Sequence, residues 1–172
     1  NAVYAYADSS HSVPRSQGRR AVMMNGAALS CRSKKHALSA PSTCVDELIE
    51  FYECTVDTVA TRNVMAELGM YQHAPSRVYQ DNRSAIQISN NRGSLGATSR
   101  AIDLKTLSAR NRIEDMEVET KYCPTAYMRA DIGTKALPEH PFANHRDVIN
   151  GYALAKAARP KKRLPEYVHA GD

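Results

Sequence analysis

The sequence of 172 residues lacks several features that would assign it to a class at once. No apolar run approaches the 18 or more residues of a membrane span, and the opening residues do not resemble a secretion signal. No C-x-x-C pair occurs, and no histidine stands at zinc-ligand spacing from a cysteine. These absences predict an intracellular domain with no membrane partner and no zinc site. They also predict buried, reduced thiols at Cys31, Cys44, Cys54 and Cys123.

The charge balance is only moderately basic. Lysine and arginine number 23 against 18 acidic residues, which gives a net charge of +5. Such a charge permits a polyanionic partner such as RNA but does not require one. The length of the chain fits one domain with enough material for a sizeable core.

Turn and alternation signals predict three antiparallel strands at the start of the chain. A Val- and Tyr-rich strand covers residues 2–8. Asn25 and Gly26 then stand between two apolar runs, and this pair favours the type I′ turn of a β-hairpin because both residues tolerate positive φ.

A long helix is predicted over residues 45–69, from apolar residues at helical spacing. Ser42 or Thr43 would cap its start, and Gly69 would end it. The later elements are a strand at 77–80, a helix at 82–89, a mobile loop at 92–98, a helix at 99–112, a strand at 117–123, and helical segments at 125–137 and 142–157. This order predicts an α/β domain over 1–157 with a mixed five-stranded sheet flanked by helices. A basic, flexible tail would follow over 158–172.

Four acidic residues stand at the ends of these predicted elements: Asp8, Glu47, Asp81 and Asp131. Carboxylates from separate elements can converge on Mg²⁺, a hard ion that prefers oxygen ligands. Two such ions about 4 Å apart can activate an attacking water and stabilise the leaving oxygen of a phosphodiester. The alternative is structural, because an aspartate after a strand often forms a turn and a glutamate favours a helix N-terminus. Position alone leaves both interpretations open.

Five short segments around these acids carry a resemblance to a known family. They are residues 6–10 (Y-A-D-S-S), 33–35 (S-K-K), 42–48 (S-T-C-V-D-E-L), 79–86 (Y-Q-D-N-R-S-A-I) and 130–138 (A-D-I-G-T-K-A-L-P). They resemble the ribonuclease H domain of Ty1/copia-type retrotransposon polyproteins. There the corresponding stretches read approximately Y-A-D-A-S, R-S-K-K, S-S-T-E-A-E-Y, Y-C-D-N-Q-S-A-I and L-A-D-I-F-T-K-A-L-P. The segments keep the same order and similar spacing over about residues 3–150.

The resemblance implies a ribonuclease H-like fold and an endonuclease that hydrolyses the RNA strand of RNA–DNA hybrids, assisted by two Mg²⁺ or Mn²⁺ ions. By the same resemblance, the metal ligands and catalytic acids are Asp8, Glu47, Asp81 and, as the fourth acidic position, Asp131. Glu47 is preferred over its neighbour Asp46 because the pattern then runs without a gap to residues 67–69 (E-L-G), similar to the family's E-E-L-G.

Basic residues near these segments are candidates for nucleic-acid contacts. Arg19, Arg20, Lys34 and Lys35 are predicted to hold phosphates, although a solvated basic loop explains them equally well. Asn82 is a candidate for a contact to the ribose 2′-hydroxyl, which would distinguish RNA from DNA.

Several positions depart from the family pattern. Cys31 stands where the family usually has tryptophan, Val45 where it has glutamate, and Ala101 and Leu107 where it has histidines. With the basic tail, these departures keep a second function open: a domesticated, non-catalytic copy that is a structural or RNA-binding component of a ribonucleoprotein. An active enzyme could instead work beside a reverse transcriptase domain. A third possibility is another nuclease or an integrase-like protein, because one fold hosts many functions.

Overall fold

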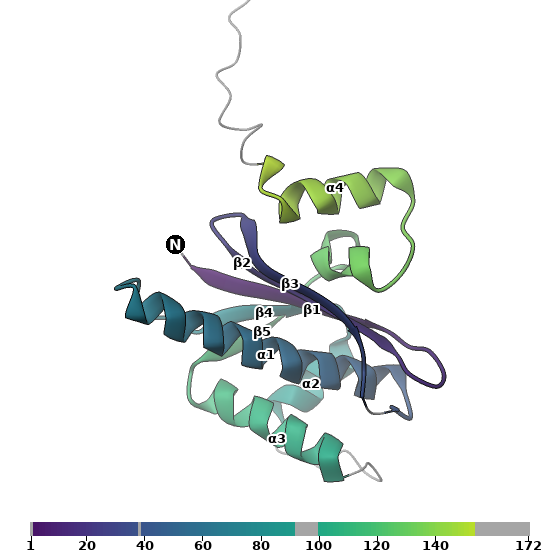
Figure 1. The fold of residues 1–172 in the computed structure, drawn as a ribbon. Helices are drawn as coiled ribbons and strands as arrows, with labels where there is room; N and C mark the ends of the chain where they lie inside the picture. Colours follow the sequence, from purple (N-terminus) through teal and green to yellow (C-terminus); the bar gives the residue numbers. More distant parts are fainter. Residues whose placement is uncertain (1, 38, 92–99, 154–172) are drawn as a thin grey trace, which may run out of the picture.

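The computed structural model describes residues 2–37, 39–91 and 100–153. Its centre is a five-stranded sheet in the order β3-β2-β1-β4-β5 (Figure 1). The strands are β1 (Val3–Ser10), β2 (Gln17–Met24), β3 (Ala27–Lys35), β4 (Ser76–Gln80) and β5 (Val118–Tyr122). The first three strands pair antiparallel, whereas β4 pairs parallel to β1 and β5 parallel to β4. The predicted mixed sheet is therefore confirmed.

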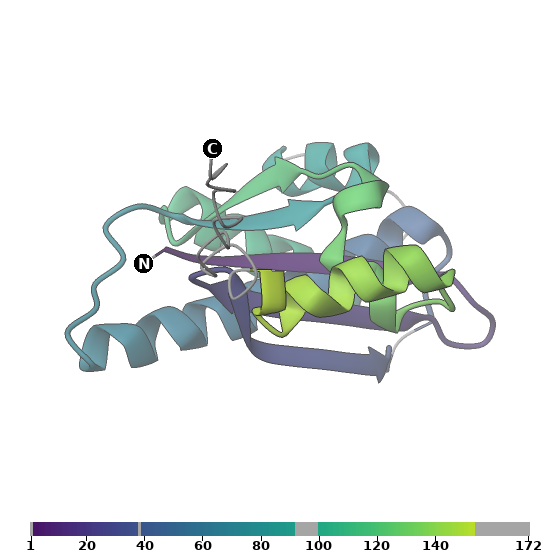
Figure 2. The same cartoon turned by 90° about the horizontal axis from the view of Figure 1, so that it is seen from above.

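Helices cover both faces of the sheet. They are α1 (Thr43–Glu67), α2 (Arg83–Asn90), α3 (Arg100–Glu114), the short 3-10 helices η1 (Thr125–Tyr127) and η2 (Arg129–Gly133), and α4 (Glu139–Ile149). The first three lie on one face, and η1, η2 and α4 lie on the other (Figure 1). Seen from the second face, α4 lies over the half of the sheet that contains β1, β2 and β3 and runs roughly along these strands (Figure 2). No helix in the described part of the chain is long and apolar enough to cross a membrane.

Strand alternation divides β1 between two environments. Val3, Ala5 and Ala7 are buried in the main core, which also contains Phe51 of α1. The intervening residues point to the opposite face, because successive side chains of a strand alternate. Asp8 therefore shares a face with Tyr6, which packs against the small cluster beside η1 and η2.

The local signals read from the sequence are present at the expected places. Asn25 and Gly26 have φ angles of 52° and 78°, as a type I′ hairpin turn requires. Ser42 caps α1, with the Val45 N–H donating to Ser42 Oγ over 3.4 Å. Gly69 follows the helix with φ of 77°.

Three local predictions need correction. The predicted helical segment 125–137 consists of two short 3-10 helices, because Pro124 and Pro138 bound a stretch whose backbone bonds run from residue i+3 to residue i. The helix predicted at 142–157 begins earlier, at Glu139, and is interrupted after Ile149, since Gly151 adopts φ of 74°; residues 152 and 153 are helical again, and 154–157 lie outside the described residues. Of the four thiols predicted to be buried, Cys54 and Cys123 are buried, but Cys44 is only half-buried and Cys31 is exposed on the edge strand β3. The predicted loop at 92–98 and the tail from 158 lie outside the described residues.

Candidate metal centre

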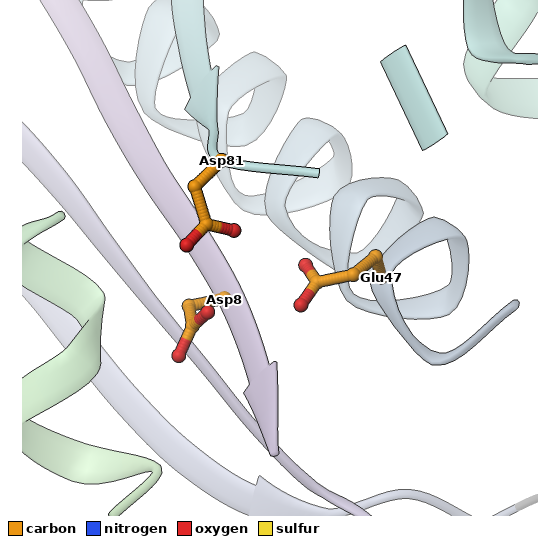
Figure 3. A group of neighbouring side chains, drawn as sticks. All are labelled: Asp8, Glu47 and Asp81. Carbon is orange, nitrogen blue, oxygen red and sulfur yellow. The ribbon is translucent and has the colours of Figure 1, made fainter. Parts of the chain in front are cut away.

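Three carboxylates meet at one edge of the sheet, and their side chains point toward one another (Figure 3). Each of Asp8, Glu47 and Asp81 offers an oxygen, and these oxygens all lie within 4.8 Å of one another. Tyr6 and Tyr79 are direct partners in the parallel β1–β4 pair, so the aspartates two residues beyond them reach the same edge. Glu47 comes from the N-terminal part of α1.

Glu47 is held in place by the two strand ends. Gln80 Nε2 donates to the Glu47 carbonyl oxygen over 2.9 Å, and the Ser9 N–H donates to Glu47 Oε1 over 3.1 Å. The other carboxylate oxygen, Oε2, is buried and has no hydrogen-bond partner among the described residues. Asp46 points elsewhere and contacts His11, Ser16 and His36 instead. The structure thus brings Glu47, not Asp46, into the cluster.

Burial and mutual repulsion oppose ionisation of these carboxyls. Burial raises the pKa of Asp8 to about 7; a hydrogen bond from Thr134 Oγ1 (2.6 Å) opposes the shift, and the charges of Asp131 and Asp81 add to it. Burial, followed by the charge of Asp8, raises the pKa of Glu47 to about 9. A divalent cation would relieve both effects. An all-oxygen donor set with an unpaired buried oxygen fits Mg²⁺ or Mn²⁺.

The fourth predicted acid lies beside this group but outside it. Asp131 is buried in η2, and its charge contributes to the raised pKa of Asp8. Its Oδ1 lies 2.8 Å from Nζ of Lys135. The stretch 131–135 therefore borders the cluster through Asp131, Thr134 and Lys135 together.

Among the predicted phosphate-binding residues, Arg19 is paired with a member of the cluster. It is the direct cross-strand partner of Asp8, so the two side chains share one face of the sheet. Gly133 makes room for it, because a Cβ at residue 133 would lie only 2.1 Å from Arg19 Cδ. Lys35 pairs with Gln17 and shares this face, whereas the exposed Lys34 pairs with Gly18 and faces the other way. Asn82 caps α2, accepting from the Ala85 N–H over 3.1 Å.

The prediction that Arg20 holds phosphates was wrong. It is only 7% exposed and faces α1, where its Nη1 lies 3.1 Å from Glu50 and its Nε 2.5 Å from Asp57. Consecutive strand residues point to opposite faces, so Arg19 and Arg20 cannot serve one phosphate surface together. Arg20 is part of the core on the α1 side.

A buried polar network was missed in the sequence. His36 lies between two carboxylates, with Nδ1 3.1 Å from Asp46 Oδ1 and Nε2 3.1 Å from Glu50 Oε2. Gly18 allows this approach, because a Cβ there would lie 2.0 Å from Glu50 Oε2. Asp46, Glu50 and Asp57 are spaced by four and seven residues, which places them on one face of α1. That spacing was visible in the sequence and could have predicted that these acids point from α1 toward the sheet.

Sheet order and covering helices define a ribonuclease H-like α/β fold. The chain is similar to the N-terminal RNase H domain of Rv2228c from Mycobacterium tuberculosis, solved as a fusion with maltose-binding protein. That match has a TM-score of 0.55 and 12% identity, over 84% of this chain and 96% of that chain.

Two structures of LC11-RNase H1 are also similar. The one in complex with an RNA/DNA hybrid has a TM-score of 0.52 and 12% identity, over 76% of this chain and 92% of that chain. The other, of the protein isolated from compost, has a TM-score of 0.52 and 13% identity, over 92% and 99%. No family model matches the sequence. At these identities the similarity establishes the fold alone.

Proposed function

We propose that this chain is a metal-dependent endonuclease that hydrolyses the RNA strand of RNA–DNA hybrids and derives from a retrotransposon. The observation that carries the proposal is the buried, unpaired Oε2 of Glu47 within a group of three converging carboxylates. A buried carboxyl oxygen without a partner is costly, and a bound cation would both supply the partner and favour ionisation of the carboxyl group. The resemblance of residues 6–10, 79–86 and 130–138 to Ty1/copia-type ribonuclease H domains supports the stated substrate and origin.

Each residue of the cluster has a role in this proposal. Asp8, Glu47 and Asp81 would hold the divalent cation. Ser9 and Thr134 orient two of these carboxylates through hydrogen bonds of 3.1 Å and 2.6 Å. The cation, when bound, supplies Lewis-acid stabilisation of charge on the phosphodiester oxygens.

Observations other than the carboxylate cluster also support an RNA–DNA hybrid as the substrate. One similar structure, LC11-RNase H1, was solved in complex with an RNA/DNA hybrid. Arg19 and Lys35 share the face of Asp8, so they could contact backbone phosphates next to the cluster. Asn82 directly follows Asp81, which keeps it a candidate for the ribose 2′-hydroxyl contact.

The test is cleavage of a hybrid that carries a different label on each strand. With Mg²⁺ or Mn²⁺, we expect the RNA strand to be cut and the DNA strand to stay intact, and EDTA to stop the reaction. Single-stranded RNA and a DNA duplex of the same sequence are the controls. A clean protein that binds the hybrid but leaves it uncut in both metals would instead support the non-catalytic ribonucleoprotein component.

Replacing Arg19 by alanine is expected to weaken binding of the hybrid. Loss of one phosphate contact lowers affinity about equally for all sequences and reduces the slope of log K against log salt by about 1. Fluorescence anisotropy of a labelled hybrid in EDTA, at several salt concentrations, measures both quantities. Arg112→Ala, on α3 at the opposite face, is the matched control and should leave the slope unchanged. Equal slopes for the two variants would remove Arg19 from the binding surface.

A further inference from the structure

The four acids of the site do not form one group. Asp8, Glu47 and Asp81 bring oxygens within 4.8 Å of one another, and Asp131 is not part of that set. A second ion would need a ligand beyond these three, and Asp131, the fourth acid that the family resemblance implies, is the candidate. In the structure that carboxylate already has a cationic partner.

The partner is Lys135, one residue after Thr134. Its Nζ lies 2.8 Å from Asp131 Oδ1. The Asp131 side chain is only 4% exposed, whereas the Lys135 side chain is 45% exposed. The lysine thus reaches inward from the surface and forms an ion pair, without hydrogen-bond geometry at Oδ1, with a carboxylate that water hardly reaches. A buried carboxylate that keeps its charge needs a cation of this kind.

The ammonium group also acts on the other acids. Partial burial works against its charge, but the carboxylates of Asp131, Asp8 and Asp81 together raise the pKa of Lys135 above its ordinary value. A lysine is charged at neutral pH at its ordinary pKa, so the contact of 2.8 Å places a positive charge directly beside Asp131. A second divalent ion placed at Asp131 would meet this charge at close range and be repelled.

We propose that the Lys135 ammonium group takes the place of a second cation beside Asp131, so that the free protein binds one divalent ion, at Asp8, Glu47 and Asp81. This inference rests on the proposed metal-dependent function. It changes the number of ions from the two that the family resemblance implies to one. Lys135 is a positioning residue here, because it acts through Asp131.

The experiment counts bound Mn²⁺ on the free protein, by isothermal titration calorimetry and by the electron paramagnetic resonance signal of unbound Mn²⁺. We expect one ion on the wild type. Lys135→Gln should bind a second ion, or bind it at least about tenfold more tightly, because Asp131 is released. Lys135→Arg keeps the charge and should keep the count at one.

Lys121→Gln is the matched control, because Lys121 forms an exposed ion pair of 3.0 Å with Glu119 on β5. It should leave the count at one. Two ions of comparable affinity on the wild type, or the same count for wild type and Lys135→Gln, would overturn the inference. If Lys135→Gln does not fold, Lys135→Met removes the same charge and its count decides in the same way. A wild type that binds no Mn²⁺ at all contradicts the proposed function instead, so the two failures are distinguishable.

Discussion

Glu47→Gln is expected to abolish hydrolysis of the RNA strand and, at the same time, to stabilise the metal-free protein. The amide keeps the shape of the side chain but supplies one neutral oxygen in place of the carboxylate. Changes beyond the ligand shell already cost 10–100-fold, so we expect loss of a ligand to lower the hybrid-cleavage rate by more than about 100-fold.

The gain in stability follows from the pKa of Glu47. Burial raises this pKa from 4.5 to about 9, so the folded protein binds the proton more tightly than the unfolded chain. The contribution of Glu47 to the stability of the metal-free protein is therefore fully present below pH 4.5 and is lost as the pH rises from there to about 9. Glutamine cannot ionise, so the variant does not pay the free energy that ionising the buried Glu47 carboxyl costs the folded wild type. At pH 8 this shift allows a gain of up to about 5 kcal/mol in the free energy of unfolding, a rise in Tm of up to about 10–20 °C.

Calorimetry in EDTA and in Mg²⁺ separates the two effects. Mg²⁺ should raise the Tm of the wild type but not that of Glu47→Gln, because only the wild type keeps all three carboxylates. Asp115→Asn, at an exposed position after α3, serves as the control and should change neither rate nor Tm. A Glu47→Gln protein that cuts at the wild-type rate, or that melts with the wild type at pH 8, would contradict the assignment.

The parts of the fold that could be predicted are those that local rules determine. Asn25 and Gly26 specify a hairpin turn, and the cap at Ser42 with the stop at Gly69 specifies α1. The prediction of one helical segment over 125–137 was wrong, because the prolines that bound this stretch leave room only for short 3-10 helices.

The site could be predicted less completely, because it depends on pairing between distant segments. Asp8 and Asp81 were recognisable as strand ends, but their meeting requires the parallel pairing of β1 with β4, across about seventy residues. Only the family resemblance suggested that meeting. The spacing of Asp131 and Lys135, four residues apart, was visible, but the sequence did not show that the lysine turns toward the site.

Arg19 and Arg20 show the same limit at single-residue scale. Both were predicted to hold phosphates, because charge and proximity in sequence were the only criteria. Strand alternation then places Arg19 beside Asp8 and Arg20 beneath α1. Strand alternation alone predicts that the two arginines lie on opposite faces of the sheet. It does not predict which of them lies on the face of the cluster. The partners of Arg20 come from α1, which begins more than twenty residues later.

Arg20→Met is expected to destabilise the fold strongly while leaving the cluster intact. Arg20 offsets the charges of Glu50 and Asp57, and Glu50 is only 1% exposed. Methionine fills a similar volume but leaves these carboxylates without that cation. Breaking a buried ion pair by removing one partner costs about 3–5 kcal/mol. We expect a Tm lower by about 6–20 °C, measured by calorimetry at pH 6.

The neighbouring His36 makes this loss dependent on pH. Burial disfavours its charged form, but hydrogen bonds and charges from Glu50 and Asp46 more than offset this and raise the pKa of His36. Its contribution is fully present below pH 6.5 and is lost as the pH rises through its pKa in the folded protein. Arg20→Met leaves His36 as the remaining cationic partner of Glu50, so the variant should lose more stability than the wild type between pH 6 and pH 8.

Arg19→Met supplies the comparison, because the same substitution one residue earlier lies on the other face of the sheet. It should change the free energy of unfolding by less than about 0.5–1 kcal/mol while weakening hybrid binding. Arg20→Met should show the reverse, with hybrid binding per folded molecule close to wild type at 20 °C. If the two variants have the same Tm, Arg20 does not stabilise the α1 side of the core. The two faces of β2 would then not have separate roles, one in stability and the other in hybrid binding.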